Sequence, residues 1–234
     1  MNDLKQQVFE ANMLLFKSGV VHCTFGNVSG VNREKGIMVI KPSGVAAYNE
    51  LTADSMVVVL LENGRPLGSA LQPSSDAPTH LELYRAFPQC GGVAHTHSAY
   101  ATACAQVQRP IRCMGTTHAD VFYGDIPVTR PFTAEETARD YERHAGLVIV
   151  ETFKSRDPVA VPAVLVANHG PFAWGRDAGD ATHNATMVEL LAKMEFVGAV
   201  LNPKAPRPEK HLVDRHYFRK HGDGAYYGQR RPNG

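Results

Sequence analysis

The stretch from which this chain is best understood is Gly91-Gly-Val-Ala-His-Thr-His97. The apolar run after the two glycines predicts a short buried strand, and residues two apart on a strand point to the same face of a sheet. His95 and His97 therefore share a face, where two imidazoles can bind a single ion, usually zinc. A pair of ordinary core or surface histidines is the alternative.

A third histidine closes a second apolar strand, in Val164-Leu-Val-Ala-Asn-His-Gly170. Because α/β proteins build sites where strands end, His169 favours a metal site shared with the first two histidines. Asp76 is a fourth candidate, since a carboxylate beside three histidines would complete the ligands of an ion that keeps an open position. Asp76 also has a simpler interpretation as the N-cap of a helix.

Composition excludes several classes of protein. With 24 basic and 23 acidic residues, the formal net charge is +1, which gives no electrostatic case for binding nucleic acid or an anionic membrane. The polar start of the chain is not a signal peptide, and no apolar run is long enough to span a membrane. The four cysteines form no CxxC pair, so we expect reduced thiols and a cytoplasmic protein. A single domain over residues 1–234 is expected from the length.

The spacing of apolar residues predicts alternating helices and strands. Several successive strands have connections too short for a parallel crossover, which favours an α/β fold with a mixed, mostly antiparallel sheet and helices on its faces. Helices are expected over 3–18, 77–87, 98–106, 177–201 and 208–220, and another from Thr133 with a capping box; strands are expected over 20–24, 37–41, 56–61, 92–97, 147–151 and 164–167.

Three short segments suit a phosphate group. Gln72-Pro-Ser-Ser-Asp76 precedes a predicted helix, whose free N–H groups and two serine hydroxyls can bind an anion. Lys41-Pro-Ser-Gly44 combines a cation with a turn that lets backbone amides approach, and Gly26-Asn27 is a third glycine-turn element. Capping and ordinary turns explain each segment singly, but together they indicate a small phosphorylated ligand.

Two later segments carry groups suited to proton transfer. Gly115-Thr-Thr-His-Ala-Asp120 is dense in polar side chains, and either His118 or Asp120 can act as an acid or base, or stabilise a turn. Near the end of the chain, Tyr226 and Tyr227 follow His216. Paired tyrosines are unusual in a solvated tail, so they either pack on a neighbour or supply a phenol to a site.

These elements together resemble the 4-epimerase branch of the class II (zinc) aldolase/epimerase superfamily, over about residues 4–229. The residues that carry the resemblance are Gly26-Asn-Val-Ser29, Lys41-Pro-Ser-Gly44, Pro73-Ser-Ser-Asp76, His95-Thr-His97, Gly115-Thr-Thr-His-Ala-Asp120, His169-Gly-Pro-Phe-Ala-Trp-Gly175 and Tyr226-Tyr-Gly-Gln229. The resemblance implies a three-layer α/β/α domain and a homotetramer whose active sites lie at subunit interfaces.

The resemblance also implies roles for individual residues. Asp76, His95, His97 and His169 would hold one Zn²⁺ per subunit, with Mn²⁺ or Co²⁺ as other ions that such a set accepts. Asp120 and Tyr227 would be the acid and base, reaching the metal from an adjacent subunit, with His216 close to them. The substrate and its phosphate would be held by Gly26, Asn27, Lys41, Ser43, Gly44, Ser74 and Ser75.

The implied reaction interconverts L-ribulose 5-phosphate and D-xylulose 5-phosphate at C4. One alternative is an aldolase that cleaves a ketose 1-phosphate such as L-fuculose 1-phosphate; such enzymes typically have Glu where this chain has Asp76 and lack the element ending at Asp120. The other is a non-catalytic scaffold with the same fold, which should have lost metal ligands.

Overall fold

The centre of the protein is a six-stranded antiparallel sheet. The computed structural model describes residues 2–222 and 224–227. The strand order is β3-β2-β1-β4-β6-β5, and each neighbouring pair is antiparallel, as the sequence predicts for most of the sheet. The strands are β1 (Gly26–Asn32), β2 (Ile37–Ile40), β3 (Val57–Leu60), β4 (Gly92–Thr96), β5 (Ala163–Val166) and β6 (Gly170–Gly175).

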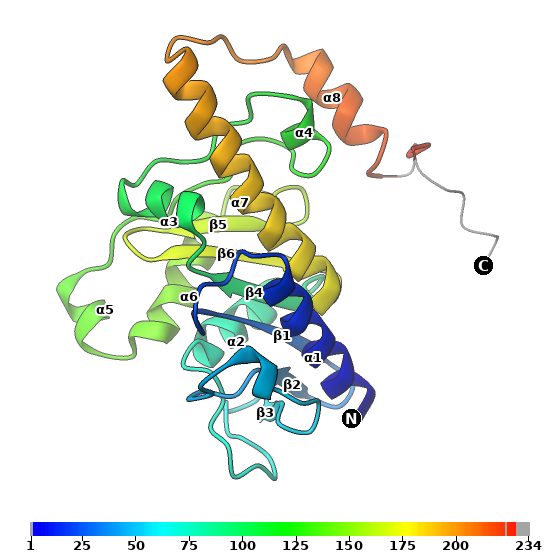
Figure 1. The fold of residues 1–234 in the computed structure, drawn as a ribbon, viewed down its shortest axis with the longest axis vertical. Coiled ribbons are helices and arrows are strands. Elements are labelled where there is room, and N and C mark those ends of the chain that lie inside the picture. The colour runs from blue at the N-terminus through cyan, green and yellow to red at the C-terminus, as the bar shows by residue number, and fades with distance from the viewer. Residues whose placement is uncertain (1, 223, 228–234) are drawn as a thin grey trace.

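Helices cover both faces of this sheet and complete an α/β/α arrangement (Figure 1). One face packs against α1 (Asn2–Lys17), α3 (Ala99–Gln106) and α7 (Ala178–Leu201). The other packs against α2 (Ala77–Ala86) and α6 (Tyr141–Thr152). The helices α4 (Thr116–Ala119) and α8 (Lys210–Phe218) contact each other at one end of the molecule (Figure 1), and η1 (Tyr48–Glu50) and α5 (Ala134–Ala138) lie in the connections.

The apolar runs of the sequence follow from burial on both faces. In β2, Ile37 and Val39 belong to the core under α1 and α7, whereas Met38 and Ile40 belong to the core under α2 and α6. Successive side chains of a strand point to opposite faces, so each must be apolar when both faces are covered. No helix of the described residues is both long and apolar enough to cross a membrane.

Several predicted elements are confirmed, and two are wrong. The helices expected over 3–18, 77–87 and 177–201 are α1, α2 and α7, and Thr133 forms the expected capping box with Glu136. The strand predicted over 147–151 lies within α6, where Val148 and Ile149 are buried among the helical packing of α2 and α6. A run of β-branched residues favours a strand locally, but tertiary packing overrides that preference.

The second error concerns the start of the sheet. The strand predicted over 20–24 is absent, because Cys23 has a left-handed backbone (φ 54°) and only an isolated bridge joins His22 and Phe25. The chain instead enters the sheet at Gly26, so Gly26-Asn27, predicted as a turn element, begins β1. No strand is predicted over 170–175, yet these residues form β6.

Candidate metal centre and acid–base cluster

The sheet brings three histidines together at one end of β4. His95 lies within β4, His97 follows its last residue, and His169 lies in the tight turn between β5 and β6. That turn lies close to β4 because Gly170 has no side chain. A Cβ at this position would lie 2.8 Å from the carbonyl oxygen of Thr96. The register of a β-hairpin therefore carries His169 to the other two histidines.

The three imidazoles have the spacing of a metal site. Their candidate ligand atoms all lie within 4.8 Å of one another, and the Nε2 atoms of His95 and His97 are 3.0 Å apart. Two nitrogen ligands of a tetrahedral zinc ion, each at about 2.0–2.1 Å, would be about 3.3 Å apart. The histidine triad (His95, His97 and His169) is thus consistent with a divalent metal site.

Neighbouring groups set the orientation and charge of the triad. His95 Nδ1 donates to the carbonyl oxygen of Pro171 at 2.9 Å, which leaves Nε2 as the ligand atom. The hydroxyl of Tyr141 lies 3.2 Å from His169 Nδ1 in the same way. Burial lowers the pKa of His97, and lowers that of His169 to about 3. These rings are therefore neutral at neutral pH, the form that binds metals.

Asp76 lies beside the triad at the start of α2. Its side chain makes no capping hydrogen bond, and its Oδ2 instead accepts from Asn27 Nδ2 at 2.7 Å. Burial alone would raise the pKa of Asp76, but the nearby His95 and His80 rings and the bond from Asn27 outweigh it and lower that pKa. The carboxylate is not within the mutual 4.8 Å grouping of the triad, so its role as fourth ligand stays a prediction.

The segments predicted to hold a phosphate run side by side next to Asp76. The N–H of Ser74 donates to the carbonyl oxygen of Lys41, and that of Ser43 donates to the carbonyl oxygen of Gln72, each at 2.9 Å. Ser43, Gly44 and Ser75 are exposed, whereas Ser74 is buried. Two segments that are 30 residues apart in sequence thus form one surface.

Lys41 and Asn27 supply buried polar groups between this surface and the triad. The Lys41 ammonium lies 5.3 Å from the centre of the Tyr48 ring, and burial lowers its pKa although the charge of Asp76 opposes the shift. Asn27 Oδ1 is buried without a hydrogen-bond partner among the described residues. The backbones of β1 and β4 lie close together at Gly26, where a Cβ would be only 3.2 Å from the carbonyl oxygen of His95.

A second group, the Asp120 cluster (Asp120, His216, Arg219, Lys220 and Tyr227), joins α4 and α8. The Asp120 carboxylate accepts from His216 Nδ1 at 3.0 Å and from Arg219 at 2.8 Å, and the Lys220 ammonium lies at 3.3 Å. The Tyr227 ring lies 4.5 Å from the Arg219 guanidinium carbon. Burial alone would raise the pKa of Asp120, but the bonds from Arg219 and His216 lower it. Asp120 and His216 are thus in direct contact, and Tyr227 is joined to them through Arg219 and Lys220.

The Asp120 cluster and the triad lie at opposite ends of the same strands. Asp120 lines a cavity of about 760 Å³ together with Cys90, which precedes β4, and Gly175, which ends β6. The triad lies where β4 ends and β6 begins. A strand of five residues spans roughly 16 Å, so within one chain the Asp120 cluster does not reach the triad.

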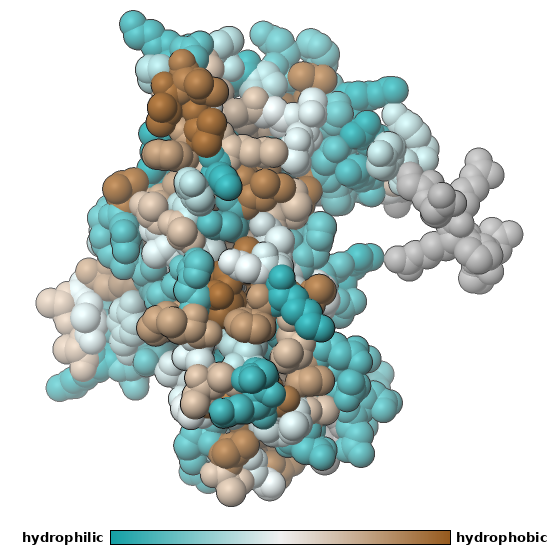
Figure 2. Space-filling model, in the orientation of Figure 1, coloured by the Kyte–Doolittle hydropathy of each residue, from teal (hydrophilic) through white to brown (hydrophobic). Residues whose placement is uncertain are grey.

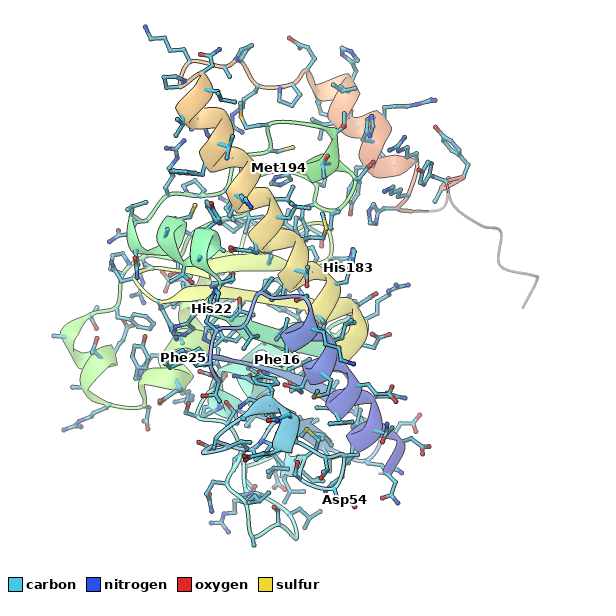
Figure 3. The ribbon with its side chains drawn as sticks, in the orientation of Figure 1. Phe16, His22, Phe25, Asp54, His183 and Met194 are labelled. Carbon is cyan, nitrogen blue, oxygen red and sulfur yellow. The ribbon has the colours of Figure 1, made fainter. Side chains whose placement is uncertain are left out.

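Other polar residues near these sites have clearer roles. His118 is buried and its Nε2 donates to the carbonyl oxygen of Gly124 at 2.7 Å, which supports the turn-stabilising interpretation. Burial lowers the pKa of His118 to about 4. Phe25, labelled in Figure 3, stacks on His97 with ring centres 5.7 Å apart. Sequence reasoning missed Tyr141 and Arg219, because no local motif marks a residue whose partner is distant in the chain.

Comparisons with known proteins found matches to both the sequence and the fold. The family profile described as "Class II Aldolase and Adducin N-terminal domain" matches residues 6–196. An L-fuculose 1-phosphate aldolase structure has 25% identity and a TM-score of 0.77, over 92% of this chain and 94% of that one. YgbL from Klebsiella pneumoniae, a candidate aldolase, epimerase or decarboxylase, has 26% identity and a TM-score of 0.71, over 91% of this chain and 97% of that one. YgbL from Escherichia coli, at 22% identity over 92% of this chain and 98% of that one, shares the fold with a TM-score of 0.73.

Proposed function

Because the chain belongs to the class II aldolase and adducin N-terminal domain family, we propose that it is a metal-dependent epimerase that interconverts L-ribulose 5-phosphate and D-xylulose 5-phosphate. The observation that carries the proposal is the histidine triad beside a buried lysine and two paired serine segments. Such a surface suits a sugar phosphate that has a ketone carbonyl near one end and a phosphate group at the other. In this proposal residues 1–234 form one domain.

The donor set fits a divalent ion. His95, His97 and His169 would hold it with Asp76, and three neutral imidazoles with one carboxylate accept Zn²⁺, Mn²⁺ or Co²⁺. When bound, the ion supplies Lewis acidity at a ketose carbonyl oxygen. The chain itself orients the ligands through Pro171, Tyr141 and Asn27.

The phosphate would lie on the paired serine segments. Backbone amides at the start of α2 and the Lys41 ammonium favour a dianion, and the exposed hydroxyls leave room for it. Binding of the phosphate group keeps the fragment that carries it in the site after the bond is cleaved, which is a positioning role. The residues proposed for this role are Gly26, Asn27, Lys41, Ser43, Gly44, Ser74 and Ser75.

Inversion at C4 requires cleavage of the C3–C4 bond, because C4 is not adjacent to the C2 carbonyl and enolisation does not reach it. A base removes the C4 hydroxyl proton, and the C3–C4 electron pair moves toward C2. The fragments are the enediolate of dihydroxyacetone and glycolaldehyde phosphate. The aldehyde group then rotates, so that its opposite face is presented to the enediolate and the C3–C4 bond re-forms on that face. An acid returns a proton to the C4 oxygen.

Asp120 and Tyr227 are the proposed base and acid, with His216 beside them. They lie in one cluster and Asp120 is held deprotonated, which supports this assignment. Because this cluster lies away from the triad of its own chain, the proposal places it at the triad of a neighbouring subunit in a homotetramer. Exposed apolar side chains on the second half of α7 support association of chains (Figure 2): Leu190, Met194, Phe196, Val197, Val200 and Leu201.

An aldolase acting on a ketose 1-phosphate is the second candidate. The observation in its favour is the likeness to an L-fuculose 1-phosphate aldolase at 25% identity. Such an enzyme would use the same bond cleavage but release the aldehyde. The Asp120 cluster supports the epimerase, because the resemblance implies that such aldolases typically lack the element that ends at Asp120 and have Glu where this chain has Asp76.

The test is to incubate metal-loaded protein with L-ribulose 5-phosphate and follow D-xylulose 5-phosphate in a coupled assay, with and without a chelator. The epimerase predicts chelator-sensitive product and its loss in Asp120→Asn, whereas Asp54→Asn, which changes an exposed carboxylate, is the matched control. Turnover of L-fuculose 1-phosphate instead would favour the aldolase. Turnover of neither sugar phosphate, or wild-type activity in Asp120→Asn, would overturn the proposal.

A further inference from the structure

The helix α3, which follows the His-x-His strand, is not capped by its own N-cap residue. It begins after Ser98, which follows His97 of the triad. The N–H groups of Tyr100 and Ala101, its second and third residues, have no partner within the helix. A serine at the N-cap usually accepts a hydrogen bond from one of these groups. The Ser98 side chain makes no such bond, and its hydroxyl oxygen instead accepts from the Thr96 hydroxyl at 3.3 Å.

The carboxylate of Glu189, on α7, takes the place of the missing cap. Its Oε1 accepts from the N–H of Tyr100 at 3.0 Å, and its Oε2 accepts from the N–H of Ala101 at 2.9 Å. The Tyr100 N–H also lies 3.1 Å from Oε2. Because Glu189 and Ala101 are 88 residues apart in the chain, the cap exists only through the packing of α7 on α3.

Two further side chains of α7 hold the same turn of α3. Lys193 and Phe196 follow Glu189 by four and seven residues, so the three lie on one face of the helix. The Lys193 ammonium lies 5.6 Å from the centre of the Tyr100 ring, and the centre of the Phe196 ring lies 5.7 Å from it. One face of α7 thus fixes the first turn of α3 through both its backbone and its Tyr100 side chain.

The helix α3 in turn connects the two segments that carry the triad. At its start, one residue separates the helix from His97. At its end, the Nδ2 of Asn168, which precedes His169, donates to the carbonyl oxygen of Gln106 at 3.1 Å. A shift of α3 would therefore change the position of His97 relative to His169.

We propose that Glu189 is a positioning residue of the metal centre, which caps α3 from α7 and thereby holds His97 in place beside His95 and His169. This inference rests on the proposed function only in taking the triad as the metal site. Capping acts in two ways. A capped first turn does not have to become ordered when the ion binds, and the carboxylate offsets the partial positive charge of a helix N-terminus, which beside His97 would oppose a cation.

Three variants separate this role from a general effect on α7. Glu189→Ala removes both the acceptor and the charge, whereas Glu189→Gln keeps one oxygen that accepts from an N–H but loses the charge. The matched control is Glu195→Gln. Glu195 lies on the same helix, but its carboxylate pairs with Arg109 and Arg112, beyond the end of α3.

The first measurement is Zn²⁺ affinity by competition with a chromophoric chelator. Glu189→Ala should bind about 2- to 30-fold more weakly than wild type, the range that corresponds to the loss of a helix cap. Glu189→Gln should fall between these two proteins, and Glu195→Gln should bind as wild type does. Wild-type affinity in Glu189→Ala, or an equal loss in Glu195→Gln, would overturn the proposal.

The second measurement needs no variant. In wild-type, metal-free protein, the amide hydrogens of Tyr100 and Ala101 should exchange with solvent as slowly as those of the next turn of α3, because the carboxylate binds them. Exchange at the rate of an unprotected amide would overturn the proposal even if the variants fail to fold.

These readouts are independent of the reaction. If the affinities and the exchange follow the expectation while L-ribulose 5-phosphate is not turned over, the proposed function fails and the role of Glu189 stands. If the epimerase is active but Glu189→Ala binds Zn²⁺ as tightly as wild type, the role of Glu189 fails and the function stands.

Discussion

We expect the variants His97→Asn and Asp120→Asn to be inactive when each is alone. When equal amounts of the two are assembled into mixed oligomers, about one quarter of wild-type activity should return. The first variant loses a member of the triad and the second loses the proposed base. If the active site is built from two chains, a mixed interface joins the intact triad of one chain to the intact Asp120 of its neighbour. Random assembly places such a pair at about one interface in four.

The structure supplies the distances behind this expectation. Proton transfer requires heavy atoms about 2.6–3.2 Å apart, whereas the five residues of β4 that separate the two groups span roughly 16 Å. A site within a single chain would need α4 and α8 to move by far more than a side chain can reach. Two chains bring the groups together without such a movement.

The assay refolds or co-expresses the two variants, isolates the mixed oligomer by size and two different affinity tags, and measures D-xylulose 5-phosphate formation. The matched control mixes His95→Asn with His97→Asn. Both of these variants damage the triad, so no interface between them is intact and no activity should return. Mixed oligomers that stay inactive in the first experiment, or that regain activity in the control, would refute the two-chain site.

Three further outcomes are expected. Tyr141→Phe should weaken Zn²⁺ binding about tenfold in a chelator competition, because it removes the hydroxyl at His169 Nδ1, and unchanged affinity would contradict this role. Lys41→Met should raise the KM for L-ribulose 5-phosphate about 10- to 100-fold with little change in kcat, and an effect on kcat alone would argue against phosphate binding. Burial lowers the pKa of His118 from 6.5 to about 4, so the unfolded chain binds the extra proton and stability falls as the pH drops through that window. His118→Gln keeps a donor for the carbonyl oxygen of Gly124. In urea unfolding, the free energy of unfolding of this variant should fall by about 1.4 kcal/mol less per pH unit than that of wild type. The same pH dependence in both proteins would exclude this role of His118.

The helices and strands that were predicted correctly are those whose signals are local. The apolar spacing of α1 and the capping box at Thr133 involve residues within one or two turns of each other. The run Ile37–Ile40 is apolar throughout because both faces of the strand are covered, and it is visible without knowledge of the partners.

The elements that were missed depend on distant partners. The 147–151 run favours a strand by its β-branched residues, yet it packs as a helix against α2. The strand β6 contains glycine and proline, which argue against a strand, and it forms because β4 and β5 lie on either side of it. The free energy gained when two segments far apart in the chain pair or pack depends on both segments, so neither sequence alone predicts it.

The sequence by itself determined which chemical groups this protein can use. Histidines that follow apolar strands, serine segments beside a lysine, and a carboxylate near a tyrosine tail are properties of residue type and spacing. Only the tertiary structure decided which of them are neighbours. The register of β4 and β6 places His169 with His95, α8 delivers Arg219 to Asp120, and the separation of these two groups follows from strand length. Side-chain chemistry is local, whereas proximity between distant residues depends on how the whole sheet pairs and packs.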